Sequence, residues 1–129
     1  MSTPEEIGKI VLTFLYFRDQ LKIYHWQTSS YARHKSIDDL LEVLSLKIDE
    51  FVEVIQGSRG FRLKIPKEKS GLKYGNDNDS STGELLRNMR YWVSLNLKGM
   101  LKEEDVGLQN IIDDIVAIVN RFIYLFSLG

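Results

Sequence analysis

Residues 34–53 read HKSIDDLLEVLSLKIDEFVE and contain four potential metal ligands at helical intervals, His34, Asp38, Asp49 and Glu53. Steps of four, eleven and four residues advance an ideal helix by about 40, 20 and 40 degrees beyond whole turns, so the four side chains share one stripe of a single helix. Asp38 and Asp49 are nevertheless about 16 Å apart along the helix axis. One ion therefore cannot be held by both ends of the stripe within one chain.

A second copy of the chain would resolve this separation. If two copies of the helix pack antiparallel about a two-fold axis, the His34 and Asp38 end of one copy meets the Asp49 and Glu53 end of the other. We therefore expect a homo-oligomer that is at least a dimer. A further candidate ligand, His25, lies upstream in the sequence YHW, on the apolar face of the preceding predicted helix.

The composition is that of one globular domain over residues 1–129. Hydrophobic residues make up 43% of the chain and charged residues 27%, which is ordinary for a protein that buries a single core. The chain has no cysteine, so any metal must be held by nitrogen and oxygen ligands, which suit iron, manganese or zinc. The net charge of −1 argues against general electrostatic capture of nucleic acid. No stretch resembles a signal peptide or a membrane span, so we expect a cytoplasmic protein without membrane contact.

Apolar residues recur at helical spacing in four segments, which predicts helices over about 4–26, 31–56, 82–101 and 106–128. Thr3-Pro4-Glu5-Glu6 and Ser81-Thr82-Gly83-Glu84 have the pattern of capping boxes, and Gly57 is expected to end the second helix. Between the second and third helices the helical rhythm disappears over residues 57–80. We therefore expect an all-α four-helix bundle with one long connection.

Each of these residues also has a structural interpretation. A lone carboxylate on a helix is usually a solvated flank residue, here with Lys35 and Lys47 as candidate partners, and a lone histidine such as His25 is usually a satisfied core residue. The complete set of ligands on one stripe favours a metal site. The basic residues between Arg59 and Lys73 are explained either by a solvated loop or by contact with an acidic partner.

The segment 24–57, YHWQTSSYARHKSIDDLLEVLSLKIDEFVEVIQG, resembles the signature of the mini-ferritin (Dps) family. In that family an HW pair ends the first helix and a second histidine opens the second helix. An aspartate follows four residues later, and a D-x-x-x-E pair comes eleven residues after that. Residues 113–128 extend the likeness more weakly. The matching positions in this chain are His25-Trp26, His34, Asp38, Asp49 and Glu53.

The resemblance implies a ferritin-like bundle with a ferroxidase site at a two-fold dimer interface. Ferrous iron would be oxidised there by peroxide or oxygen, at one or two iron positions that zinc or manganese could also fill. Ferric iron would be stored in a homo-oligomeric cage of up to twelve chains, as protection against oxidative stress. Trp26 would be a candidate electron donor. The implied metal ligands are His25, His34 and Asp38 from one subunit and Asp49 and Glu53 from the other.

The resemblance also implies a cation channel lined by acidic residues, for which the candidates are Asp105, Asp113 and Asp114. The structural alternative is that negative charge at residues 103–105 favours the start of the fourth helix. DNA binding is not expected, because the chain lacks the lysine-rich tail that supports it in the family. The alternative function is a ferritin-like structural or interaction protein whose metal site is degenerate or merely stabilising.

Overall fold

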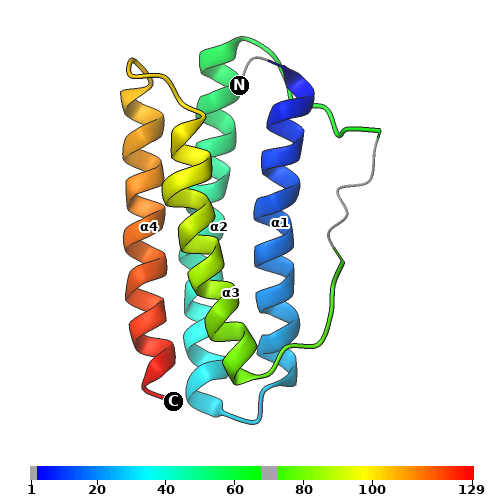
Figure 1. The fold of residues 1–129 in the computed structure, drawn as a ribbon, viewed down its shortest axis with the longest axis vertical. Coiled ribbons are helices and arrows are strands. Elements are labelled where there is room, and N and C mark those ends of the chain that lie inside the picture. Colours follow the sequence, from blue (N-terminus) through cyan, green and yellow to red (C-terminus); the bar gives the residue numbers. More distant parts are fainter. Residues whose placement is uncertain (1–2, 68–72) are drawn as a thin grey trace.

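The computed structural model describes residues 3–67 and 73–129, and all its regular elements in those ranges are helical (Figure 1). The all-α prediction is therefore confirmed. A π-helical turn, η1, continues the third helix directly. In chain order the elements are α1 (Pro4–Gln27), α2 (Tyr31–Arg59), α3 (Asp79–Tyr91), η1 (Trp92–Leu97) and α4 (Val106–Ser127).

Helix α2 packs against both α1 and α4, while α3 packs mainly against α4 and touches α1 more lightly. The described parts of the chain between α2 and α3 lie along the outside of α1, and α3 begins at the opposite end of the bundle from the end of α2 (Figure 1). This long connection allows α2 and α3 to run in the same direction. None of the helices in the described part of the chain is both long and apolar enough to cross a membrane.

The core forms where the apolar stripes of the helices meet. Helix α2 buries a stripe of apolar residues at three- and four-residue spacing. Helices α1 and α4 bury apolar stripes with the same spacing. Phe14 of α1 lies at the centre, with its ring 5.8 Å from that of Phe51 and 5.0 Å from that of Trp92, both edge to face. The buried apolar residues of α2 are Ile37, Leu40, Leu41, Leu44, Ile48, Phe51 and Ile55.

Two helix ends differ from the sequence prediction. Helix α2 continues past Gly57 and ends at Gly60, whose φ of 77° is left-handed and therefore favours glycine. Helix α3 is capped by Asn78, because the Asn78 side chain accepts from the Ser81 N–H while the Ser81 hydroxyl accepts from the Asn78 N–H. Ser81 is thus the third residue of the helix and not its cap. The predicted start of α1 is confirmed, since the Thr3 hydroxyl accepts from the Glu6 N–H.

The described parts of the α2–α3 connection are bound to α1. Near the start of α1, the Lys64 N–H donates to the Pro4 carbonyl at 3.1 Å. Further along, the side-chain amide of buried Gln20 pairs with the backbone of Gly75 through two hydrogen bonds of 2.7 and 3.0 Å. Residues 68–72, which carry part of the predicted basic run, lie outside the described residues.

An enclosed ion pair joins the end of α2 to the start of α4. The two terminal nitrogens of Arg59 donate to the two carboxylate oxygens of Asp105, each at 2.9 Å, and the Asp105 side chain is only 7% exposed. The Lys102 N–H donates to the same carboxylate at 2.9 Å. These hydrogen bonds, above all those from Arg59, lower the pKa of Asp105 from 3.8 to about 2.

The close contact of the connection with α1 predicts opposite effects of alanine at two helical glycines. A Cβ on Gly8 would lie 2.0 Å from the Lys64 carbonyl oxygen, whereas a Cβ on Gly57 would have nothing within 4 Å. We expect Gly8→Ala to lower the free energy of unfolding by about 2 kcal/mol, because backbone must move. Gly57→Ala should raise it by about 0.5–1 kcal/mol through helix propensity. Urea unfolding measures the change in the free energy of unfolding for each variant. Changes of the same sign in the two variants would contradict the packing described.

The Arg59–Asp105 pair predicts a pH-dependent contribution to stability. Because folding lowers the Asp105 pKa, its stabilisation is complete above the unfolded-state value of 3.8 and is lost as the pH falls through about 2. We expect Asp105→Asn to lower the free energy of unfolding by about 2 kcal/mol at pH 7. The difference from the wild type should shrink as the solution is acidified through that range.

The matched control is Asp113→Asn, which removes an exposed ion pair with Lys98. That substitution should cost about 1 kcal/mol or less. Denaturation curves at neutral and acidic pH that show the same loss for both variants would contradict a special role of the enclosed pair.

Candidate functional site

His25 and His34 face each other where α1 turns into α2. Their rings stack with centroids 3.8 Å apart and planes inclined by 15°. The Nδ1 atom of His25 lies 2.8 Å from the main-chain carbonyl oxygen of His34, and the Nδ1 atom of His34 lies 2.7 Å from that of His25. A carbonyl oxygen can only accept, so both Nδ1 atoms donate. The two imidazoles therefore hold the two helix ends together by reciprocal hydrogen bonds.

The short turn between the helices makes this arrangement possible. Ser30 caps α2, because its hydroxyl accepts from the Arg33 N–H. The Thr28 hydroxyl accepts from the Ser30 N–H and fixes the turn. His34 consequently lies in the first turn of α2, directly opposite the last turn of α1.

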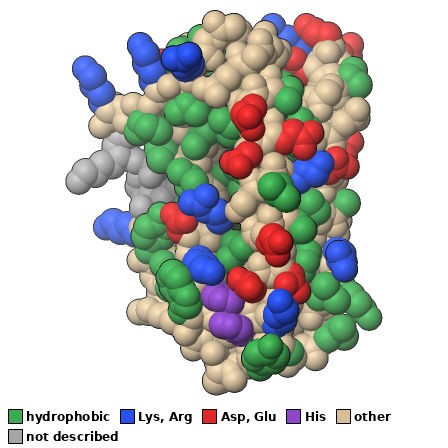
Figure 2. All heavy atoms as spheres, turned by 180° about the vertical axis from the view of Figure 1, so that it is seen from behind, with side chains coloured by type: hydrophobic (Ala, Val, Ile, Leu, Met, Phe, Trp, Pro, Cys, Tyr) green, Lys and Arg blue, Asp and Glu red, His purple; other side chains and the backbone are tan. Residues whose placement is uncertain are grey.

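Asp38 adds a carboxylate to the histidine pair, one helical turn beyond His34. Its Oδ1 lies 3.9 Å from Nε2 of His25 and 3.8 Å from the Nζ atom of Lys22. The His25 side chain is only 8% exposed, whereas that of Asp38 is 48% exposed. Figure 2 shows the two histidines side by side at the surface, with acidic side chains close to them. Of the predicted ligands, His25 thus lies against His34 and within 3.9 Å of Asp38.

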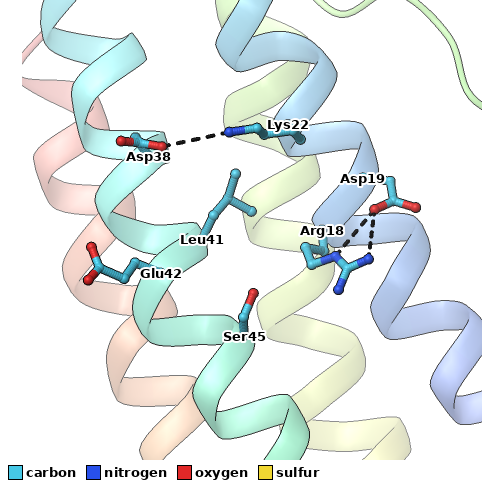
Figure 3. Close-up of a pocket in the computed structure, with 7 residues that line it drawn as sticks. All are labelled: Arg18, Asp19, Lys22, Asp38, Leu41, Glu42 and Ser45. Carbon is cyan, nitrogen blue, oxygen red and sulfur yellow. Dashed lines mark hydrogen bonds and ion pairs between the residues drawn. The ribbon is translucent and has the colours of Figure 1, made fainter.

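A polar groove between α1 and α2 continues from Asp38 along the outer face of the bundle (Figure 3). It has both signs of charge, and Lys22 and Asp38 approach each other across it. Buried Leu41 contributes apolar surface between the polar side chains. The residues that line the groove are Arg18, Asp19, Lys22, Asp38, Leu41, Glu42 and Ser45.

Asp49 and Glu53 lie farther along α2, on exposed positions. A single chain does not bring them to the histidines, and within residues 3–67 and 73–129 no group of three or more His, Cys, Asp or Glu side chains is arranged to hold a metal ion. Lys47, a candidate partner in the structural interpretation, instead pairs with Glu50 at 3.2 Å and with Asp114 at 3.1 Å. The site in one chain therefore lacks two of the five predicted ligands, Asp49 and Glu53.

The remaining predicted residues are placed as follows. Trp26 is 69% exposed and its ring lies under the Lys22 ammonium at 5.3 Å. Each of the three candidate channel aspartates has a basic partner within the chain. These pairs are Asp105 with Arg59, Asp113 with Lys98 at 2.7 Å, and Asp114 with Lys47 at 3.1 Å.

Sequence reasoning missed a polar network beside the site. The Tyr24 hydroxyl donates to Asp79, and Arg33 donates to the same carboxylate at 2.9 Å, so the network joins α1, α2 and α3. Burial and the Asp79 hydrogen bond raise the pKa of Tyr24 to about 12. Sequence reasoning also missed Lys22, although the spacing of residues in the sequence points to it. Lys22 precedes His25 by three residues and so shares its helix face.

Comparison with known proteins gives two findings and one absence. The model of a family of unknown function, DUF5856, matches residues 25–126. An uncharacterized 14.6 kDa protein from the mobD-ri intergenic region of Enterobacteria phage T4 is 29% identical over 124 residues, which cover 96% of this chain and 87% of that protein. No solved structure matches the chain.

These findings correct one inference from the sequence. The assignment to the mini-ferritin (Dps) family is wrong, because the matching family model is a different one and the phage relative is uncharacterized. The likeness rested on a few polar residues whose spacing keeps them on one helix face, and many amphipathic helices share such spacing. The matched region includes α2, α3, η1 and all of α4 except its last residue. This chain belongs to the family of unknown function DUF5856.

Proposed function

We propose that the protein binds ferrous iron at a site shared by two copies of the chain, where peroxide or oxygen takes up the electrons and oxidises it to ferric iron. The observation that carries this proposal is the histidine pair, in which both Nδ1 atoms donate to main-chain carbonyls. Such a hydrogen bond fixes the tautomer and leaves Nε2 of each ring with its lone pair, as in protein metal sites. Asp38 supplies a carboxylate oxygen next to one of these nitrogens.

The stacked rings favour two ions over one. In-plane lone pairs of nearly parallel rings 3.8 Å apart run along separate lines and do not converge on one point. Each imidazole therefore suits its own ion. A nitrogen and oxygen donor set of this kind accepts ferrous iron, with manganese and zinc as substitutes.

The second copy would supply the missing carboxylates. Asp49 and Glu53 have no ion-pair or side-chain hydrogen-bond partner in the described part of the chain, so both are available as ligands. Antiparallel pairing of two α2 helices would bring the partner's Asp49 to Asp38 and the partner's Glu53 to His34. In such a pairing the carboxylates would repel one another unless a cation lay between them. The proposed pairing of two chains therefore requires a bound metal ion.

A second candidate function has its own supporting observation. The reciprocal hydrogen bonds of the histidine pair are complete within one chain and join α1 to α2. They would serve equally in a structural or interaction protein in which a metal is absent or merely stabilising. The two candidates differ in whether Nε2 binds an ion.

The histidine tautomers can be tested without metal. We expect long-range proton–nitrogen NMR spectra at neutral pH to show both His25 and His34 as the Nδ1–H tautomer, because each Nδ1 faces a carbonyl oxygen. Single substitutions by glutamine assign the signals. An Nε2–H tautomer at either residue would remove the observation on which the proposal rests.

Mixing two defective variants tests the shared site. One variant carries His34→Ala and Asp38→Ala, and the other carries Asp49→Ala and Glu53→Ala, so each should have lost ferrous binding and oxidation alone. A mixed dimer has one intact site, so equal mixing and exchange should restore about one quarter of the wild-type sites. Anaerobic ferrous titration and the rate of ferric formation measure the recovery.

The control is a mixture of the first variant with Glu84→Ala, an exposed residue of α3 far from the stripe in sequence. This mixture shows how much ferrous binding and oxidation is recovered when the second chain behaves like the wild type. Full iron binding by the Asp49→Ala and Glu53→Ala variant alone would contradict the shared site, and no binding by the wild type would contradict the function.

A further inference from the structure

A second groove opens between the start of α1 and the end of the third helix, far from the histidine pair. Its volume is about 320 Å³, which lies within the range of about 300–1,000 Å³ of small-molecule sites. Thr13 in this groove and His25 are twelve residues apart on α1, or about 18 Å along the helix axis. The residues that line the groove are Glu6, Lys9, Ile10, Thr13, Trp92 and Met100.

The groove exists because the bundle is not tightly closed on this side. Helix α3 packs mainly against α4 and touches α1 more lightly, and Figure 1 shows α3 and η1 diverging from α1 toward the start of α1. Apolar side chains are therefore left along the opening. Ile10 is buried at its base, Trp92 is partly exposed, and Met100 is 44% exposed. An apolar molecule in the groove would remove this surface from water, which is favourable.

Trp92 gives the groove a fixed aromatic wall. It is the first residue of the π-helical turn η1, and such turns are rare and frequently lie at functional sites. Its ring is held edge to face by Phe14 at 5.0 Å and lies 6.0 Å from Phe17. In the described part of the chain the Trp92 indole N–H has no protein acceptor, and it is not fully buried. The wall thus also offers a hydrogen-bond donor.

The charges on the rim of the groove favour a negative charge in the ligand. Lys9 is exposed, and within residues 3–67 and 73–129 its ammonium has no ion-pair or hydrogen-bond partner. Glu6, the other charged residue of the lining, already interacts with another group. It also lies in the first turn of α1, where the helix dipole stabilises its charge. The uncommitted charge of the rim is therefore the positive one.

We propose that this groove binds an apolar molecule that carries a single carboxylate, of the chemical class of medium-chain fatty acids. The apolar chain would pack against Ile10, Trp92 and Met100, and the carboxylate would accept a charge-assisted hydrogen bond from Lys9. One ammonium balances one negative charge, which matches a carboxylate better than a doubly charged phosphate. The inference does not depend on the proposed metal site, because the two sites share no residue.

The chain has two tryptophans, which allows the groove to be observed directly. Trp26 is 69% exposed, so Trp26→Phe should leave the fold intact and make Trp92 the only tryptophan. We expect decanoate, titrated into this full-length variant at neutral pH, to shift the Trp92 emission to shorter wavelength with saturation, because the chain displaces water from the ring. Decanol, which has the same chain without the charge, should bind about fivefold more weakly.

Two further substitutions in the Trp26→Phe background locate the ligand. Lys9→Gln should weaken decanoate about fivefold, to the level of decanol, because the ion pair is lost. Thr13→Phe should abolish binding of both probes by filling the groove. The matched control is Lys35→Gln, which removes an exposed lysine from the first turns of α2 at the other end of the bundle. That control should leave both affinities unchanged.

The proposal is overturned by any of three results. The first is the absence of a saturable change in Trp92 emission with decanoate. The second is equal affinity for decanoate and decanol, or an equal loss in Lys9→Gln and Lys35→Gln, since the charge of Lys9 would then have no specific role. The third is unchanged binding by Thr13→Phe, which would place the ligand elsewhere. Circular dichroism of each variant verifies that the helices are intact.

Discussion

Helix α2 has to bury one apolar stripe against two neighbours at once, and the rest of the structure depends on this constraint. The stripe faces both α1 and α4, and Phe51 reaches the central aromatic contact with Phe14. Because the stripe is fixed, the polar residues beside it are fixed as well. Asp38 is held at the edge facing α1, next to His25, while Asp49 and Glu53 follow the same edge into solvent. The candidate site is thus a consequence of core packing.

The features that could be predicted from the sequence are those that depend on local periodicity. Helical spacing is sufficient to place His34 and Asp38 on one face, and the Thr3 cap acts through a neighbouring N–H. Features decided by contacts between distant segments could not be predicted. Gly57 stays inside α2 while Gly60 ends it, and the Asn78 cap precedes the serine expected in that role. Family membership could not be derived either, because a few ligands on one face are compatible with many helical proteins.

The histidine pair can serve the fold and a metal at the same time. Its Nδ1 atoms join two helix ends, which is a structural role, while its Nε2 atoms stay out of those hydrogen bonds. Hydrogen bonds that orient a ligand before the metal arrives reduce the reorganisation that binding requires. Under the proposed function, the same contacts that stabilise the turn would also orient the half-site.

Under the proposed function, charge on the outer face of α2 would couple metal binding to assembly. Asp38, Glu42, Asp49 and Glu53 share one edge of the helix, and two copies packed through that edge would bring eight carboxylates together. Lys22 offsets one of these charges in each copy by contacting Asp38. A divalent ion at each proposed half-site would attract the free carboxylates of the other copy. On this reasoning the metal and the second chain each create the conditions under which the other binds, which is thermodynamic coupling between two sites.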